Sequence, residues 1–206
     1  HWWFVGRRAL IAEALRYALK GRRVLRSLDV GCGTGAHAEL LRSVSREVVS
    51  TDSSPLALTL LRERHPELEV RHVSFPEGFS DAENGRYGCI LLADVLEHLP
   101  DDRTALSRIS TLLEPKGIAV FTVPAFPVLW SDHDKIAGHF RRYTKSELVQ
   151  RINEVLELRI LSLSYCNFFL FPVVALVRFA ERIFGIGRGQ SDFFRLPAIV
   201  NQLLAF

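Results

Sequence analysis

The alternation of short apolar runs with helical patterns constrains the fold of this 206-residue chain more than any other feature. Runs typical of strands cover residues 24–30, 47–52, 68–73, 87–94, 117–124 and 156–165. Helical patterns cover 7–20, 36–43 and 102–113, and further helices are expected from Ser54 and from Thr144 onward. This alternation predicts an α/β fold with a doubly wound, Rossmann-like, mostly parallel sheet and helices on both faces.

Several element boundaries carry their own signals. The run YGCILLAD at 87–94 is apolar on both faces, as expected of a central strand in a parallel sheet. Ser54 is a suitable N-cap residue, and Pro55 suits the first helical position. Thr144 followed by Glu147 has the form of a capping box, which predicts a helix that starts at this threonine.

Composition limits the classes of partner. With 48% apolar and 24% charged residues, the chain has the composition and length of one ordinary globular domain. A formal net charge of +3 and scattered basic residues argue against nucleic acid as a partner. The three cysteines (Cys32, Cys89, Cys166) are far apart and odd in number, which favours a reducing, cytoplasmic setting over a disulfide framework.

The N-terminus bears on how much of the protein this chain represents. Charged side chains at Arg7, Arg8, Glu13 and Arg16 interrupt the first twenty residues, so the sequence predicts no signal peptide. The chain contains no methionine and starts with His1, so we expect it to be part of a longer protein.

A glycine-rich segment, LDVGCGTG at 28–35, lies at a predicted strand-to-helix turn. Glycines at such a turn let the backbone approach a ligand closely, and the following helix presents its amide hydrogens to that ligand. The segment fits the dinucleotide pattern G-x-G-x-x-A, which alone is weakly specific. However, Asp29 would repel a pyrophosphate and attract a cation, whereas Asp52 suits a ribose diol. The residues therefore favour a ligand with a ribose and a positive charge but no phosphate.

Together with Asp52 and the segment ADVLEHL at 93–99, this motif resembles the class I S-adenosylmethionine-dependent methyltransferases over roughly residues 24–165. The resemblance implies S-adenosylmethionine as cofactor and S-adenosylhomocysteine as its product. It also implies that Asp29 lies by the amino group of the cofactor and that Asp52 holds the ribose hydroxyls. Cofactor contacts are accordingly expected from Asp29, Gly31, Cys32, Gly33, Gly35, Asp52, Ser53, Ser74, Phe75, Ala93 and Asp94.

One part of the chain departs from the family pattern, and another has two interpretations. Many relatives carry an acidic residue after the third strand to hold the adenine amino group, whereas this chain reads Val73, Ser74, Phe75. We expect Ser74 or the backbone to take that role. Glu97 and His98 are expected to orient the loop after the fourth strand, and contact of His98 with cofactor or substrate is the alternative.

The segment WSDHDKIAGHFRRYT at 130–144 follows the fifth predicted strand. Because ligands bind outside the carboxyl ends of the strands in such sheets, we expect it over the methyl-donor end of the pocket. His133 or His139 could act as a catalytic base near neutral pH. The remaining candidates, all for substrate binding, are Asp134, Arg141, Arg142 and Tyr143, the two arginines as a receptor for a carboxylate or phosphate.

This segment has two other interpretations. In the structural one, the arginines pair with the neighbouring helix, Tyr143 packs in the core and Asp132 caps a turn. In the other, Asp132, His133, Asp134 and His139 hold a metal ion. Adjacent positions on one short loop rarely converge on one ion, so no metal is predicted.

The aromatic N-terminal segment HWWFVGRR predicts either a lid that closes the edge of the core or a cover for the cofactor pocket. In the second case Trp2, Trp3 or Phe4 would cover the pocket, and Arg7 or Arg8 would bind the cofactor carboxylate or the substrate. Trp3 and Arg7 are therefore candidate substrate-binding residues. With HD....H.RRYT, this segment also resembles a bacterial methyltransferase subgroup of the type 11/12 kind with an unsettled substrate. Members usually end in an antiparallel strand, which we expect either beyond this chain or missing from it.

Residues 166–206 are expected to form an apolar helical extension of the domain made by residues 1–165. The ten apolar residues at 168–177 are too few to span a bilayer, which takes about 20. They predict either a packed amphipathic helix or a helix over 168–184 that touches a membrane surface.

The leading functional hypothesis is methyl transfer from S-adenosylmethionine to a small-molecule or lipid-linked acceptor, in the cytoplasm or at a membrane. Oxygen is favoured over nitrogen or carbon as the target atom. An NAD-type oxidoreductase is the alternative enzyme, disfavoured by Asp29. A third hypothesis is a non-catalytic protein of the same fold that binds a partner or membrane.

Overall fold

The computed structural model describes residues 2–155 and 157–166, except for the side chains of Trp2 and Trp3. The strands are β1 (Val24–Val30), β2 (Ser45–Asp52), β3 (Glu69–His72), β4 (Tyr87–Ala93) and β5 (Leu113–Thr122). The α-helices are α1 (Trp2–Leu19), α2 (Ala38–Val44), α3 (Pro55–Arg64), α4 (Asp102–Leu112), α5 (Asp132–Ile136) and α6 (Lys145–Asn153). Short 3-10 turns are η1 (Asp81–Glu83), η2 (Leu96–His98) and η3 (Pro127–Leu129).

The strands form one sheet in the order β3-β2-β1-β4-β5, and every neighbouring pair is parallel. The chain builds outward from β1 to β3 and then crosses to β4 on the other side of β1. Asp29 of β1 pairs with Ser50 of β2 on one side and with Leu91 of β4 on the other. The carboxyl ends of β1 and β4 therefore lie side by side, at the switch point where ligands bind in such sheets.

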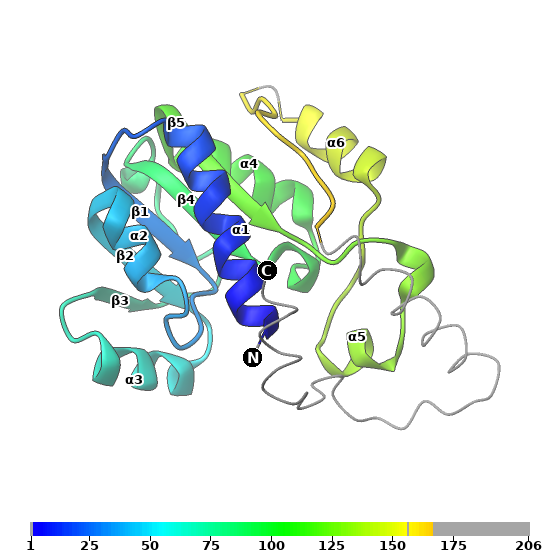
Figure 1. The fold of residues 1–206 in the computed structure, drawn as a ribbon, viewed down its shortest axis with the longest axis horizontal. Coiled ribbons are helices and arrows are strands. Elements are labelled where there is room, and N and C mark those ends of the chain that lie inside the picture. Colours follow the sequence, from blue (N-terminus) through cyan, green and yellow to red (C-terminus); the bar gives the residue numbers. More distant parts are fainter. Residues whose placement is uncertain (1, 156, 167–206) are drawn as a thin grey trace.

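Helices cover both faces of the sheet (Figure 1). On one face, Leu15 of α1 packs in an apolar cluster with Leu91 of β4. On the other face, Ile90 packs with Leu106 of α4 and Ile152 of α6. Successive strand residues point to opposite faces, so the continuous apolar run of β4 is buried on both sides. The predicted doubly wound α/β fold is confirmed.

The two predicted helix starts are confirmed in atomic detail. The Ser54 hydroxyl accepts a hydrogen bond of 3.3 Å from the backbone nitrogen of Ala57, and Pro55 is the first residue of α3. The Thr144 hydroxyl accepts a bond of 3.2 Å from the backbone nitrogen of Glu147, whose carboxylate in turn accepts from the Thr144 nitrogen. Both arrangements satisfy amide groups that a helix N-terminus leaves without internal partners.

The prediction of a sixth strand over 156–165 is wrong for residues 157–165, which join no strand of the described sheet. Leu158, Ile160 and Leu163 nevertheless pack against the apolar cluster on the α4 and α6 side. The apolar character of the run thus reflects the partial burial of these three side chains, although Leu161 and Tyr165 are exposed. A strand also needs a partner strand for its backbone hydrogen bonds, and an apolar pattern does not show whether one is available.

Across residues 2–155 and 157–166, no helix is both long and apolar enough to cross a bilayer. The predicted helical extension, the membrane-surface helix over 168–184 and the final antiparallel strand all lie outside the described residues.

Candidate active site

The glycine loop between β1 and α2 has the open, close-approach geometry that its sequence predicts. Gly31 has a φ of +65°, and a Cβ there would lie 2.6 Å from Cγ2 of Val95. Gly33 has a φ of +53°, and a Cβ would meet no atom within 4 Å. L-residues rarely adopt such positive φ values. The loop therefore packs closely on the segment after β4 at Gly31 and leaves its backbone open to a ligand at Gly33.

Asp52, the last residue of β2, holds this loop in place. Its Oδ2 accepts a hydrogen bond of 2.8 Å from the Gly33 backbone nitrogen, and its Oδ1 accepts one of 2.8 Å from the Ser54 nitrogen. The side chain is half-buried. Each carboxylate oxygen has a second lone pair, so both remain able to accept from ligand hydroxyls.

Asp29, near the end of β1, is the most buried carboxylate of the cofactor motif. It is 1% exposed, and its Oδ2 has no hydrogen-bond partner among the described residues. Burial raises the pKa of Asp29 to about 7, and the nearby Asp52 carboxylate adds to the rise. A ligand ammonium group placed here would supply the missing partner and favour the ionised form. The cofactor that the resemblance implies carries such a group, so these residues fit it.

The other predicted cofactor residues line the same edge of the sheet or the segments next to it. Cys32 is buried, and burial raises the pKa of its thiol. Ser53 and Ser74 are exposed. Phe75 is buried and packs edge-on against Phe79, with ring centroids 5.6 Å apart. Their roles toward a cofactor stay predictions.

Arg7 links the N-terminal helix to the end of β4. Its guanidinium pairs with the Asp94 carboxylate, and the centroid of the Phe4 ring lies 5.6 Å from the guanidinium carbon. Asp94 follows Ala93, has a φ of +57°, and accepts a hydrogen bond of 2.7 Å from the Thr122 hydroxyl of β5. The first turns of α1 therefore lie against the carboxyl edge of the sheet. Trp3 belongs to α1, but its side chain is outside the described part.

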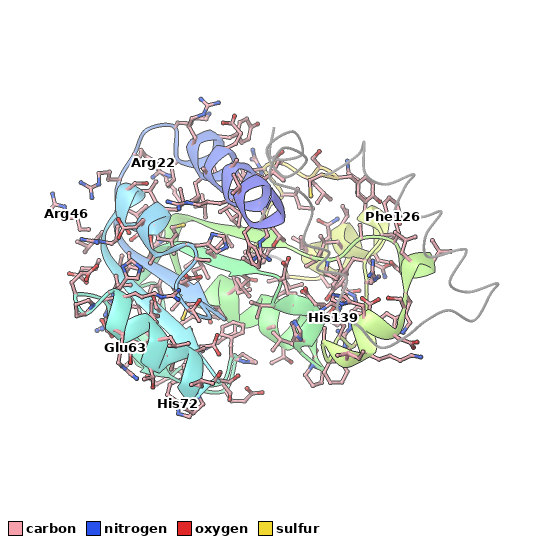
Figure 2. All side chains as sticks on the ribbon, turned by 60° about the horizontal axis from the view of Figure 1, so that its bottom comes forward. Arg22, Arg46, Glu63, His72, Phe126 and His139 are labelled. Carbon is pink, nitrogen blue, oxygen red and sulfur yellow. The ribbon has the colours of Figure 1, made fainter. Side chains whose placement is uncertain are left out.

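The segment 130–144 forms α5 and the loop after it, beyond the carboxyl end of β5 (Figure 1). Figure 2 shows His139 and Phe126 in the half of the molecule opposite to Arg22 and Arg46. The Phe140 backbone nitrogen donates a bond of 2.7 Å to the Glu97 carbonyl, so this segment is tied to the turn after β4.

Asp134 organises the centre of the segment. It is fully buried, and its two oxygens accept from Nε and Nη2 of Arg142 at 2.8 and 3.0 Å. Nδ1 of His139 lies 2.9 Å from Asp134 Oδ1. Burial alone would raise the pKa of Asp134, but the bonds from Arg142 and His139 outweigh it and lower this pKa to about 2. Because an ionised carboxylate only accepts, Nδ1 of His139 carries a proton, and a neutral ring would then have its lone pair on Nε2.

Arg141 and Tyr143 turn away from this centre toward Asp102 of α4. Nη1 of Arg141 lies 3.0 Å from Asp102 Oδ2, and the Tyr143 hydroxyl donates to the same oxygen at 2.9 Å. Arg151 of α6 reaches Asp102 Oδ1 at 2.7 Å. Asp102 is 1% exposed. Arg141 and Tyr143 thus join the segment to two helices, and Arg142 is held by Asp134, so binding of substrate by these three residues stays a prediction.

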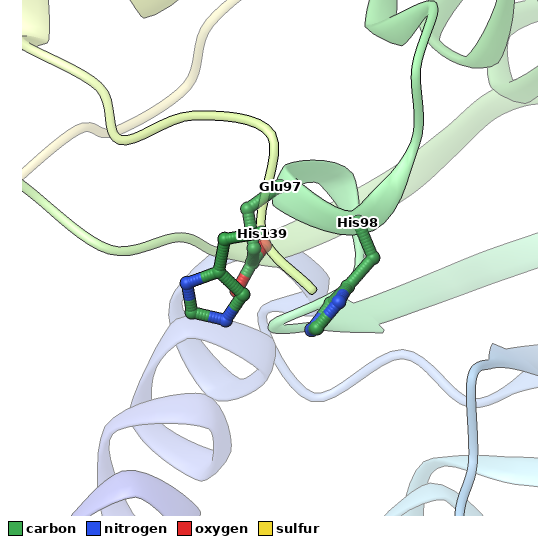
Figure 3. Close-up of side chains that lie close together, drawn as sticks. All are labelled: Glu97, His98 and His139. Carbon is green, nitrogen blue, oxygen red and sulfur yellow. The ribbon is translucent and has the colours of Figure 1, made fainter. Parts of the chain in front are cut away.

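The structure brings His139 next to two residues from the turn after β4, Glu97 and His98 (Figure 3). The rings of His98 and His139 meet edge to face with centroids 4.7 Å apart, and the His133 ring lies 6.4 Å from that of His139. Glu97 is 1% exposed, and its Oε2 has no hydrogen-bond partner in the described part. Burial raises the pKa of Glu97 to about 7, although the charges of Arg7 and Arg142 oppose the rise.

Sequence reasoning missed His37, which follows the glycine loop. It is 5% exposed, and neither ring nitrogen has a hydrogen-bond partner within the described residues. Burial, helped by the charges of Arg7 and Arg8, lowers the pKa of His37 to about 4. Its position two residues after Gly35, where the helix amides face the ligand, is the signal that could have identified it.

Comparison with known proteins agrees with this geometry. Residues 4–157 match the family described as a methyltransferase domain. The ubiquinone biosynthesis O-methyltransferase of Alkalilimnicola ehrlichii is 34% identical over 108 residues, which are 50% of this chain and 42% of that protein. A probable S-adenosylmethionine-dependent methyltransferase of Mycolicibacterium smegmatis is 27% identical over 124 residues, covering 60% of this chain and 46% of that protein. The chain thus spans less than half the length of these curated relatives.

Solved structures share the fold. The N-methyltransferase NodS of Bradyrhizobium japonicum, in complex with S-adenosyl-L-homocysteine, matches with a TM-score of 0.56 and 24% identity over 71% of this chain and 73% of that chain. The YcgJ protein of Bacillus subtilis matches with a TM-score of 0.59 and 18% identity over 72% of this chain and 66% of that chain. The family match, together with the glycine loop and its two acidic residues, sets the oxidoreductase hypothesis aside. This chain belongs to the class I S-adenosylmethionine-dependent methyltransferases.

Proposed function

We propose that the protein transfers a methyl group from S-adenosylmethionine to a hydroxyl oxygen of a small-molecule or lipid-linked acceptor. The observation that carries the proposal is the meeting of two sets of residues at one sheet edge. Asp29, Gly33 and Asp52 form the cofactor side. His139 is hydrogen-bonded to Asp134 and lies on the segment 130–144, whose backbone is hydrogen-bonded to the turn after β4.

On the cofactor side, the chain's residues bind and orient. Bound there, the cofactor supplies an electrophilic methyl group on a positively charged sulfur. Asp29 would accept from the cofactor ammonium group, and Asp52 would accept from the ribose hydroxyls while it holds Gly33. His37, Arg7 and Arg8 lie close enough to interact electrostatically, and we assign this group to the cofactor carboxylate. Together they would fix the donor before the acceptor arrives.

On the acceptor side, a base must take the hydroxyl proton as the methyl group moves. His139 is one candidate for this base, because Asp134 engages its Nδ1 and the neutral ring then has a lone pair on Nε2. His133, whose ring lies next to that of His139, is the second candidate. Oxygen as the target atom is supported by the O-methyltransferases among the curated relatives.

Binding of the cofactor product, S-adenosylhomocysteine, tests the first requirement of the proposal. Calorimetry of the full-length protein with S-adenosylhomocysteine should show one site per chain, and a thermal-shift comparison should show stabilisation by this compound and none by NAD. A folded, full-length sample that fails to bind S-adenosylhomocysteine would refute the proposal.

The domain organisation and the lipid-linked acceptor are further parts of the proposal. We assign residues 1–165 to the methyltransferase domain, with α1 as its lid, and 166–206 to an apolar extension of the same domain, in which 168–184 is the segment that could contact acceptor lipid or membrane. Flotation with liposomes, with and without residues 166–206, tests this part. Flotation that does not depend on the extension would remove it from that role. Cofactor binding without methyl transfer to any fraction of a cell extract would instead favour the non-catalytic alternative.

A further inference from the structure

Three side chains from two separate segments meet beside the candidate active site. Glu97, His98 and His139 place one carboxylate oxygen and two imidazole nitrogens within 4.8 Å of one another (Figure 3). Glu97 and His98 belong to η2 after β4, whereas His139 follows α5. Glu97 and His98 are neighbours on one turn, and His139 reaches them from a second segment, so the group does not rest on a single loop. One carboxylate and two imidazoles form a set that binds divalent transition metals.

One of the two histidines, His139, has a ring nitrogen engaged by a carboxylate. Nδ1 of His139 is held by Asp134 at 2.9 Å. Metal-binding histidines usually donate one ring N–H to a carboxylate or a carbonyl, which fixes the ring and leaves the other nitrogen as the ligand. The surroundings of His139 therefore match those of a metal ligand.

Among the described residues, Glu97 has no hydrogen-bonded cation. Arg7 pairs with Asp94, and Arg142 pairs with Asp134. Glu97 is 1% exposed, and its Oε2 has no hydrogen-bond partner among the described residues. A buried carboxylate without such a partner is costly, and a bound cation would supply one. His98 is exposed, so solvent reaches the group from that side.

We propose that Glu97, His98 and His139 bind one divalent transition-metal ion of the zinc kind, whose open coordination position takes the acceptor's hydroxyl oxygen. Three protein ligands leave a fourth position free in tetrahedral coordination. Two imidazoles favour zinc and its neighbours in the first transition row over magnesium or calcium. A hydroxyl bound to such an ion loses its proton more readily than it does in water.

The catalytic part of this inference rests on the proposed methyl transfer. The acceptor O–H bond gives its proton to His133 or to water. The oxygen electron pair then forms the bond to the methyl carbon, while the carbon–sulfur bond breaks and its pair stays on sulfur. His139 acts as a metal ligand in this scheme, so the role of base falls to His133 or to solvent.

A second group of similar composition supplies a control. Glu39, His65 and Glu67 also lie within 4.8 Å of one another, but both glutamates are exposed. Arg42 already pairs with Glu39 at 2.9 Å and with Glu67 at 2.8 Å. This surface group carries no proposal of its own, and His65→Gln removes its histidine.

The test uses zinc itself and the tag-free, full-length protein without a methyl donor. Competition with a chromophoric chelator measures the zinc affinity and stoichiometry of the wild type, His98→Ala, Glu97→Gln and His65→Gln. Cobalt substitution adds a visible spectrum that reports histidine ligation. We expect one tight zinc per chain, an affinity at least tenfold lower in His98→Ala and in Glu97→Gln, and no change in His65→Gln.

The outcomes separate this inference from the proposed function. Unchanged zinc affinity in His98→Ala, no zinc binding by the wild type, or loss of zinc in His65→Gln would each overturn it. His98 is exposed, so its substitution is compatible with folding, and unchanged binding of S-adenosylhomocysteine by His98→Ala verifies this. Zinc binding without any binding of S-adenosylhomocysteine would refute the proposed methyl transfer but would leave the inference of a metal site intact.

Discussion

The Asp52 carboxylate joins two loops of the site, because its Oδ2 accepts a hydrogen bond of 2.8 Å from the backbone nitrogen of Gly33. Its other oxygen accepts from the Ser54 nitrogen. The residue that we expect to hold the ribose hydroxyls therefore also holds the glycine loop. Cofactor affinity and loop geometry depend on the same side chain.

Asp52→Ala is expected to weaken binding of S-adenosylhomocysteine by about 100-fold. Hydrogen bonds to a charged group contribute roughly 1.5–3 kcal/mol each, and the variant loses those to the ribose as well as the loop contact. Calorimetry measures the effect. Asp81→Asn, at a side chain that is 96% exposed, is the matched control and should bind as the wild type does. An unchanged affinity in Asp52→Ala would remove this residue from the cofactor site.

Asp29→Asn should change stability and cofactor affinity in opposite directions. The pKa of Asp29 is raised to about 7 in the folded protein, so the folded state binds more protons than the unfolded state between about pH 4 and 7. The contribution of this carboxyl to stability is thus present at low pH and lost as pH rises through 7. The Asp29→Asn variant has no carboxyl group to ionise. Above pH 7 its free energy of unfolding should therefore exceed that of the wild type by up to about 4 kcal/mol, at roughly 1.4 kcal/mol per pKa unit.

The measurement compares melting temperatures of Asp29→Asn and wild type at pH 5 and pH 8, with and without S-adenosylhomocysteine. Without ligand, the advantage of the variant should be larger at pH 8. With ligand it should shrink or reverse, because the ligand ammonium group loses its carboxylate. An advantage that is equal at both pH values would show that Asp29 ionises normally.

Much of this site follows from sequence, because its residues stand at fixed places on regular elements. Asp29 and Asp52 are found at strand ends, and the strand order then brings them within electrostatic reach of each other. The glycine loop also follows from local sequence. Gly31 and Gly33 have positive φ values, which glycine adopts more readily than other residues, so the glycines themselves mark the turn.

The segment 130–144 could be placed from sequence but not resolved into roles. Its pattern shows two adjacent arginines, yet Arg142 turns to Asp134 and Arg141 to Asp102, which is 39 positions earlier and belongs to α4. Likewise, nothing in the spacing of Glu97 and His98 indicates that His139 reaches them. Long-range ion pairs depend on how the loops pack, and side-chain chemistry at single positions does not encode that packing.

His133→Ala is expected to spare binding of S-adenosylhomocysteine and lower turnover by about 100-fold or more, the usual contribution of a general base. Methyl transfer is measured with labelled S-adenosylmethionine and an acceptor fraction isolated from a cell extract. His72→Ala, an exposed histidine whose ring contacts the Ser53 carbonyl, is a control for loss of an imidazole near the cofactor side. Unchanged turnover in His133→Ala would exclude this residue as the base.

Substitutions around Asp102 should reveal which part of the segment 130–144 is structural. Asp102→Ala leaves the side chains of Arg141, Arg151 and Tyr143 without their shared carboxylate, which is 1% exposed. Breaking a buried ion pair on one side costs about 3–5 kcal/mol, whereas Tyr143→Phe removes one hydrogen bond and should cost roughly 1–2 kcal/mol. Arg103→Ala removes a surface pair with Glu154 and should cost at most about 1 kcal/mol.

Urea unfolding of the three variants should therefore give the order Asp102→Ala, Tyr143→Phe, Arg103→Ala, from the most to the least destabilised. Zinc binding, measured below the unfolding transition, should persist in Tyr143→Phe because its ring belongs to the Asp102 network and not to the group around His139. If Tyr143→Phe lost both stability and zinc binding, the network around Asp102 and the group around His139 would act as one unit. If Asp102→Ala cost no more than Arg103→Ala, then Arg141 would not depend on Asp102, and its role as an anion receptor would become the better interpretation.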